Sequence, residues 1–127
     1  MRDRVTTVYG ALALLWAVAV VVQVFLAGLG IFGASTFKAH TDFGGILHGI
    51  TALLLILAIV GPRTGRDIGM AAGLLVLVTV QSGLVGARDD APGLAALHPV
   101  LALFALGLAV HMGMHALRTR RAVAAPA

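Results

Sequence analysis

Four apolar stretches constrain the fold of this chain more than any other feature of its sequence. They cover about 8–30, 40–60, 68–86 and 94–117, with short polar or glycine-rich segments between them. A helix needs about 20 apolar residues to cross the hydrocarbon core of a membrane. Charged residues make up only 11% of the 127 residues, too few to cover the surface of a soluble domain. We therefore expect one all-α domain, an integral membrane four-helix bundle.

The positions of the basic residues predict how this bundle is oriented. Seven of the nine lie at the two termini or between the second and third stretches, and only Lys38 and Arg88 lie elsewhere. Cytoplasmic loops of membrane proteins are enriched in Lys and Arg. We therefore expect a protein of the cell membrane with both termini in the cytoplasm. The C-terminal segment 118–127 is expected to form a loose basic tail. Because topology explains the net charge of +4, that charge does not indicate a nucleic-acid partner.

A constant offset of 58 positions relates the two halves of the chain. Its polar and glycine matches include Gln23 with Gln81, Gly28 with Gly86, His40 with His98, and Gly49 with Gly107. Such matches are rarer in a membrane chain than apolar-on-apolar ones. The pattern predicts two pseudo-repeated helical hairpins that each carry one histidine.

His40 and His98 are predicted to lie at nearly the same depth in the membrane. His40 precedes Gly61 by 21 residues and His98 precedes Leu117 by 19. At 1.5 Å per residue, their depths differ by about 3 Å. Two imidazoles at one depth suit the two axial positions of a haem iron. We therefore expect His40 and His98 to ligate one b-type haem near the outer face. The chain has no cysteine, which excludes thiolate ligands.

The other three histidines leave alternatives open. His48 lies nearer the middle of its helix, but it shares with His98 the spacing to a following Ala-Leu pair, so it remains an alternative partner for His98. His111 and His115 are spaced i, i+4 near the cytoplasmic end of the last helix, a spacing that can hold a metal. No carboxylate or third histidine is evident at their depth, so we expect structural or surface roles for them.

Four further polar residues are candidates for the same site. Gln23 and Gln81 are expected to hydrogen-bond a ligand histidine or a substituent of the bound ring; the alternative is a plain interhelical hydrogen bond. Lys38 and Arg88 are placed where the propionates of an outward-facing haem would emerge. Solvated loop charges explain each of these two equally well.

The run Gln-x4-Gly, polar loop, Leu-His and Ala-rich helix resembles one four-helix half of the heme A synthase family. It is read here at Gln23…Gly28…His40 and at Gln81…Gly86…Leu97-His98. The resemblance implies a bundle with a histidine on its second and fourth helices, grouped around haem at the outer side. The chain also resembles a family of small bacterial four-span proteins of unknown function, through residues 23–32, Ala39-His40-x3-Gly44 and Leu97-His98-Pro99.

Several departures limit what the first resemblance implies. Heme A synthase has eight spans, a glutamate just before its first ligand histidine and cysteines in its loops, whereas this chain has four spans, no glutamate and no cysteine. Thr41 and Pro99 stand where that family has an arginine. The resemblance therefore extends to the bundle and to haem ligation, and not to the oxidation of a haem methyl group.

Three functions follow as expectations. The first is a small membrane haem protein that transfers electrons or holds haem, alone in the lipid bilayer, as a homodimer or within a larger membrane complex. The second is a structural or accessory membrane subunit without haem. The third is a haem-modifying enzyme whose homodimer restores eight spans. Because every aspartate lies at a loop or helix end and no glutamate exists, no acid–base pair is evident, and we favour a role without catalysis.

Overall fold

The chain folds into long antiparallel helices. The computed structural model describes residues 2–61 and 63–124, apart from the side chains of 2, 3 and 120–124. The elements are α1 (Arg2–Ile31), α2 (Lys38–Val60), α3 (Gly65–Leu84), a 3-10 turn η1 (Val85–Ala87), the short α4 (Pro92–Ala95) and α5 (Leu97–Ala124). The expected all-helical chain with four long apolar helices is confirmed.

The helix boundaries differ most from expectation at the two ends of the chain. α1 begins at Arg2 instead of near residue 8, and α5 continues through Arg118 to Ala124, where a loose tail was expected from 118. Apolar composition marks the part of a helix that suits the membrane core, and a helix can continue beyond that part through charged residues. Pro62 and residues 125–127 of the expected tail lie outside the described residues.

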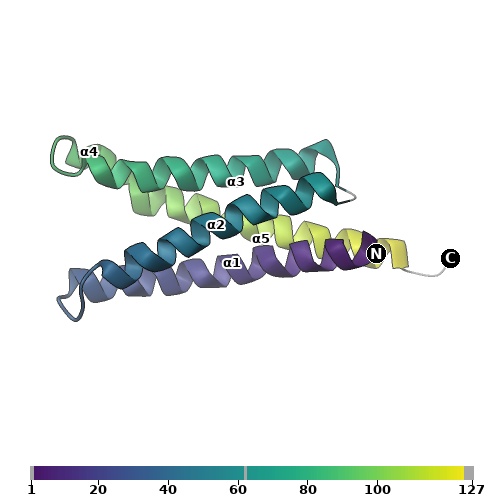
Figure 1. The fold of residues 1–127 in the computed structure, drawn as a ribbon, viewed down its shortest axis with the longest axis horizontal. Helices are drawn as coiled ribbons and strands as arrows, with labels where there is room; N and C mark the ends of the chain where they lie inside the picture. Colours follow the sequence, from purple (N-terminus) through teal and green to yellow (C-terminus); the bar gives the residue numbers. More distant parts are fainter. Residues whose placement is uncertain (1, 62, 125–127) are drawn as a thin grey trace.

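Each long helix packs against two neighbours. α1 contacts α2 and α5, and α3 also contacts α2 and α5, so the four form a closed ring of antiparallel pairs (Figure 1). Both termini lie at one end of the bundle, called here the terminal end. The connections 32–37 and 88–91 lie at the opposite end, called the distal end.

The four long helices suit a membrane environment. They contain four segments that are long and apolar enough to cross a membrane: Arg4–Ile31, Lys38–Val60, Gly65–Ala87 and Pro92–Thr119. Large apolar side chains such as Phe25, Ile59 and Phe104 point away from the bundle and are more than half exposed. A water-soluble bundle would place charged residues on this outer surface. By length and composition, these four helices indicate a multi-pass membrane protein.

α1 and α5 approach each other closely near the terminal end. A Cβ atom on Gly113 of α5 would stand 2.6 Å from Leu14 Cγ and 2.9 Å from the main-chain oxygen of Gly10 on α1. Small residues that let backbones come together are typical of helix pairs in membranes. Toward the distal end the α1–α2 pair and the α3–α5 pair diverge (Figure 1). The two pairs therefore lie closer together at the terminal end than at the distal end.

The connection between α2 and α3 is more structured than the sequence suggested. The hydroxyl of Thr64 accepts a hydrogen bond from the main-chain N–H of Asp67, and the Asp67 carboxylate accepts one from the N–H of Thr64. This reciprocal capping box satisfies two N–H groups at the start of α3. It also draws the Asp67 side chain inside the bundle, where only 4% of the residue is exposed.

Candidate functional site

A cavity of about 700 Å³ occupies the distal half of the bundle. All four long helices line it, mostly with apolar and small side chains. The lining also includes Gln23, His40, His48, Gln81 and His98, five of the seven residues that the sequence selected. Its size lies in the range of about 300–1,000 Å³ that is usual for small-molecule and cofactor sites.

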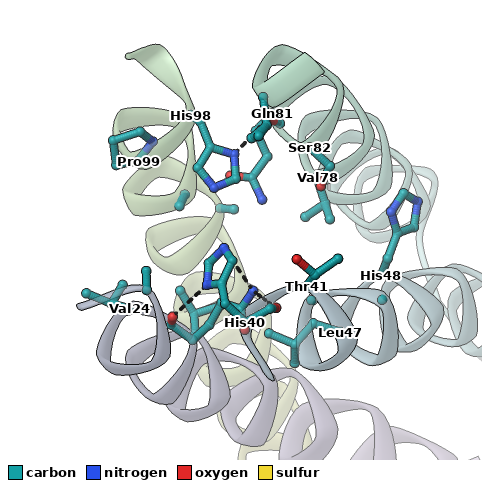
Figure 2. A pocket seen from close by; sticks show the side chains of 18 of the residues that line it. Val24, His40, Thr41, Leu47, His48, Val78, Gln81, Ser82, His98 and Pro99 are labelled. Atoms are coloured by element: carbon teal, nitrogen blue, oxygen red, sulfur yellow. Dashed lines mark hydrogen bonds between the residues drawn. The ribbon is translucent and has the colours of Figure 1, made fainter. Parts of the chain in front are cut away.

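Within this cavity, His40 of α2 and His98 of α5 lie opposite each other. Their ring centres are 6.2 Å apart, and the ring planes are inclined at 69° (Figure 2). Each histidine lies in the first turn of its helix, at the distal end. The two helices, α2 and α5, stand diagonally across the bundle from each other. The structure therefore brings together the two histidines that stand 58 positions apart.

Each of the two rings is fixed by a main-chain oxygen on the neighbouring helix. His40 Nδ1 lies 3.0 Å from the carbonyl oxygen of Gln23, and His98 Nδ1 lies 2.8 Å from that of Gln81. A carbonyl oxygen only accepts hydrogen bonds, so Nδ1 carries the proton in both rings. In a neutral imidazole the remaining nitrogen, Nε2, is then an acceptor. The cavity thus contains two acceptor nitrogens, on rings that point toward each other in Figure 2.

The two glutamine side chains differ in what they contact. The Gln23 amide donates to the carbonyl oxygen of His40 at 2.8 Å, and its nitrogen also lies 3.5 Å from His40 Nε2. A Cβ atom on Gly44 would stand 2.7 Å from that amide nitrogen, so glycine leaves the space that Gln23 occupies. Among the described residues, the side-chain oxygens of Gln23 and Gln81 are buried without a hydrogen-bond partner. Such atoms are costly to leave unpaired.

His48 does not face His98. Its Nε2 lies 3.1 Å from the hydroxyl oxygen of Thr79 on α3, and that hydroxyl donates its one proton to the carbonyl of Leu75. His48 must therefore donate from Nε2, so this nitrogen has no free lone pair. Figure 2 shows the ring beside α3, away from the His40–His98 pair. Of the two alternatives that the sequence left open, the structure places His40 opposite His98.

Lys38 and Arg88 lie at the distal end but outside the cavity lining. Lys38 pairs with Asp42 at 2.5 Å and Arg88 with Asp89 at 3.4 Å, and all four side chains are exposed. Both cations are thus already paired with carboxylates. This arrangement matches the alternative of solvated loop charges.

The histidines near the terminal end have a carboxylate neighbour that the sequence analysis did not foresee. His115 Nε2 lies 3.7 Å from Asp67 Oδ1, and the rings of His111 and His115 are stacked with centres 6.1 Å apart. The expectation of no carboxylate at this depth is wrong because the capping box turns Asp67 inward. No group of three or more His, Cys, Asp or Glu side chains that suits a metal ion occurs among the described residues.

Two contacts of the site were not foreseen from the sequence. The indole N–H of Trp16, which lines the cavity, donates to the carbonyl of Leu47 at 2.9 Å and joins α1 to α2. The Thr79 hydroxyl holds His48 away from the cavity centre. A single tryptophan in an apolar stretch gives no signal for its partner, because the partner is a main-chain group on another helix.

The comparisons with known proteins agree with one of the two resemblances. The model of a family described as "Family of unknown function (DUF6220)" matches residues 23–88, a segment that contains Gln23, His40 and Gln81 and covers just over half of the chain. No match to the heme A synthase family was found. No curated protein and no solved structure matches the chain.

Proposed function

This chain belongs to the family of unknown function DUF6220, and we propose that it is a membrane protein that binds one b-type haem between His40 and His98. The observation that carries the proposal is the pair of unprotonated Nε2 atoms on two rings that point toward each other in a largely apolar cavity (Figure 2). The Gln23 amide reaches only the Nε2 atom of His40, so both nitrogens are satisfied together only by an electron-pair acceptor between them. A metal centre supplies one.

The spacing of the rings would let His40 and His98 hold one metal between their Nε2 atoms. A metal–nitrogen bond to an imidazole is about 2.0 Å long, so both rings must lie within a few ångströms of a shared metal. The ring centres of His40 and His98 are 6.2 Å apart. The hydrogen bond from each Nδ1 to a carbonyl is the contact that usually orients a ligand histidine and increases its basicity.

Haem fits the site better than a bare metal ion. Within the described part of the chain, no third His, Cys, Asp or Glu joins this pair in a metal-binding group, whereas a porphyrin brings four nitrogen ligands of its own. The cavity of about 700 Å³ is far larger than an ion needs. The small residues Gly44, Gly45 and Ala102 line it and leave room for a flat ring.

Bound haem would supply one-electron redox chemistry, so the proposed role is electron transfer or haem holding. The proposal includes the topology inferred from charge, with both termini in the cytoplasm and the cavity near the outer face of the cell membrane. It also includes an origin from two repeated hairpins. In each half, a histidine ring contacts the main-chain oxygen of the glutamine seventeen residues before it, and this recurrence supports the origin.

The visible spectrum of the detergent-purified protein tests the proposal. We expect a Soret band in the full chain from haem-replete cells, and its loss in the double variant His40→Ala/His98→Ala. The matched control is His48→Ala, which removes a third imidazole that lines the cavity and should keep the band. Helix content from circular dichroism verifies that each variant is folded. A colourless wild-type protein that also fails to bind added haemin would refute the proposal and favour a structural subunit.

A further inference from the structure

The two histidines of the cavity have unequal surroundings. His40 Nε2 has the Gln23 amide nitrogen at 3.5 Å, and because this ring nitrogen is unprotonated, the amide is the donor of that contact. Among the described residues, His98 Nε2 has no hydrogen-bond partner, and the Gln81 amide makes no corresponding contact. The same Nδ1 contact recurs in both halves, whereas the Nε2 contact occurs in one.

One methyl group explains this difference. Gly44 follows His40 by four residues, and Ala102 follows His98 by four. A Cβ at Gly44 would lie 2.7 Å from the Gln23 amide nitrogen, so the Gln23 contact exists only because position 44 has no side chain. At position 102 an alanine Cβ is present. If the two halves correspond, this Cβ stands where a Cβ at position 44 would lie, and a Gln81 amide in the equivalent position would meet it at a similarly short distance.

This asymmetry affects how firmly each imidazole holds a metal. An imidazole that leaves a metal exposes its lone pair in an apolar cavity, and an unpaired buried acceptor is costly. His40 avoids much of this cost because the Gln23 amide is in place to donate to it. His98 has no such donor. The unligated state is therefore favoured for His40 and disfavoured for His98.

We propose that His98 is the permanent haem ligand and His40 an exchangeable one, so that the site admits a small exogenous ligand on its His40 side. This inference rests on the haem-binding function proposed above and makes it more specific. A protein restricted to electron transfer keeps both axial positions filled. An exchangeable histidine gives the site the further activity of binding a diatomic ligand, with the Gln23 amide beside the vacated position.

Single variants and carbon monoxide test the inference on the full-length protein in detergent. We expect His98→Ala to lose haem on gel filtration. His40→Ala should retain it as a five-coordinate, high-spin centre and bind carbon monoxide at least tenfold more tightly than the reduced wild type. Wild-type protein should itself bind carbon monoxide, with the spectrum of the form held by two histidines replaced by that of a carbon monoxide adduct. Equal loss of haem in both single variants, or a wild-type spectrum unchanged at saturating carbon monoxide, would overturn the inference.

A matched pair of substitutions tests the role of the methyl group. Gly44→Ala displaces the Gln23 amide, so unligated His40 loses its donor and should bind the haem iron more firmly. The carbon monoxide affinity should then fall about fivefold to tenfold, the effect of one hydrogen bond. Ala102→Gly opens the space beside His98 and should weaken haem retention instead. The inference is wrong if the two substitutions act alike. A wild type without haem would overturn the haem proposal itself, whereas a wild type with haem and equivalent histidines would overturn this inference alone.

Discussion

The imidazole Nδ1 of His98 lies 2.8 Å from the main-chain oxygen of Gln81, and His40 makes the same contact with Gln23 at 3.0 Å. Each contact joins two antiparallel helices of one hairpin at the distal end. The orientation of each ring is therefore set by the neighbouring helix, and not by the loop that connects the two. A rigid acceptor that fixes the ring is the kind of support that a metal ligand requires.

Trp16 provides an internal reporter of the cavity. It is the only tryptophan of the chain, it is 3% exposed, and it lines the cavity together with the two histidines. We expect added haemin to quench the tryptophan fluorescence with a stoichiometry of one per chain. The titration should lose this saturable phase in the double variant His40→Ala/His98→Ala. Quenching of the same amplitude in that variant would indicate haemin that binds elsewhere.

Thr79→Val should destabilise the bundle without affecting the site. The substitution removes the acceptor of the His48 Nε2–H group, which then lies unpaired between α2 and α3. We expect a loss of about 1–2 kcal/mol in the free energy of unfolding, measured by titration with sodium dodecyl sulfate and circular dichroism. Thr79→Ser keeps the hydroxyl and should restore wild-type stability. Haem content should be unchanged in both, and loss of haem in either would implicate His48.

Gly113→Ala should weaken the packing of α1 against α5. The new Cβ would stand 2.6 Å from Leu14 Cγ and 2.9 Å from the main-chain oxygen of Gly10, and a backbone atom cannot move aside as a side chain can. Overpacking of this kind costs about 1–3 kcal/mol. The control is Gly107→Ala on the same helix, whose Cβ would meet nothing within 4 Å. The unfolding titration should separate the two variants, and equal stability would contradict the close helix approach.

Thr64→Ala should destabilise the start of α3. The Thr64 hydroxyl accepts from the N–H of Asp67 and also donates to its carboxylate. Loss of an N-cap side chain typically costs about 1 kcal/mol. Thr64→Ser should behave as wild type in the same unfolding titration. If Thr64→Ser were less stable than Thr64→Ala, the hydroxyl would not be the group that stabilises the start of α3.

The distal cations should be dispensable for haem binding. Lys38 and Arg88 lie outside the cavity lining, and each is paired with an exposed carboxylate. We expect the double variant Lys38→Ala/Arg88→Ala to retain the haem content and the unfolding midpoint of the wild type, because exposed ion pairs contribute little stability. Haem content is read from the pyridine haemochrome spectrum. A clear reduction would restore these residues to the site.

The sequence predicted the helices well and the site in part. The four apolar stretches fixed the number and approximate extent of the long helices, because the apolar length needed to cross a membrane is narrowly defined. The offset of 58 selected Gln23, His40, Gln81 and His98, and these four residues line one cavity. The choice between His40 and His48 could not be made from periodicity. It depends on Thr79, which lies on another helix.

Composition and spacing by themselves determined that this chain forms four long apolar helices. They also determined which histidine stands at the start of each of the two helices, α2 and α5, that begin at the distal end. These are local properties, set by side-chain hydropathy along consecutive residues. Tertiary structure alone decided which ring nitrogens carry a proton, that Asp67 meets His115, and that Gly44 leaves space for the Gln23 amide. Each of these depends on a contact of a few ångströms between different helices, and hydropathy along one helix contains no information about such contacts.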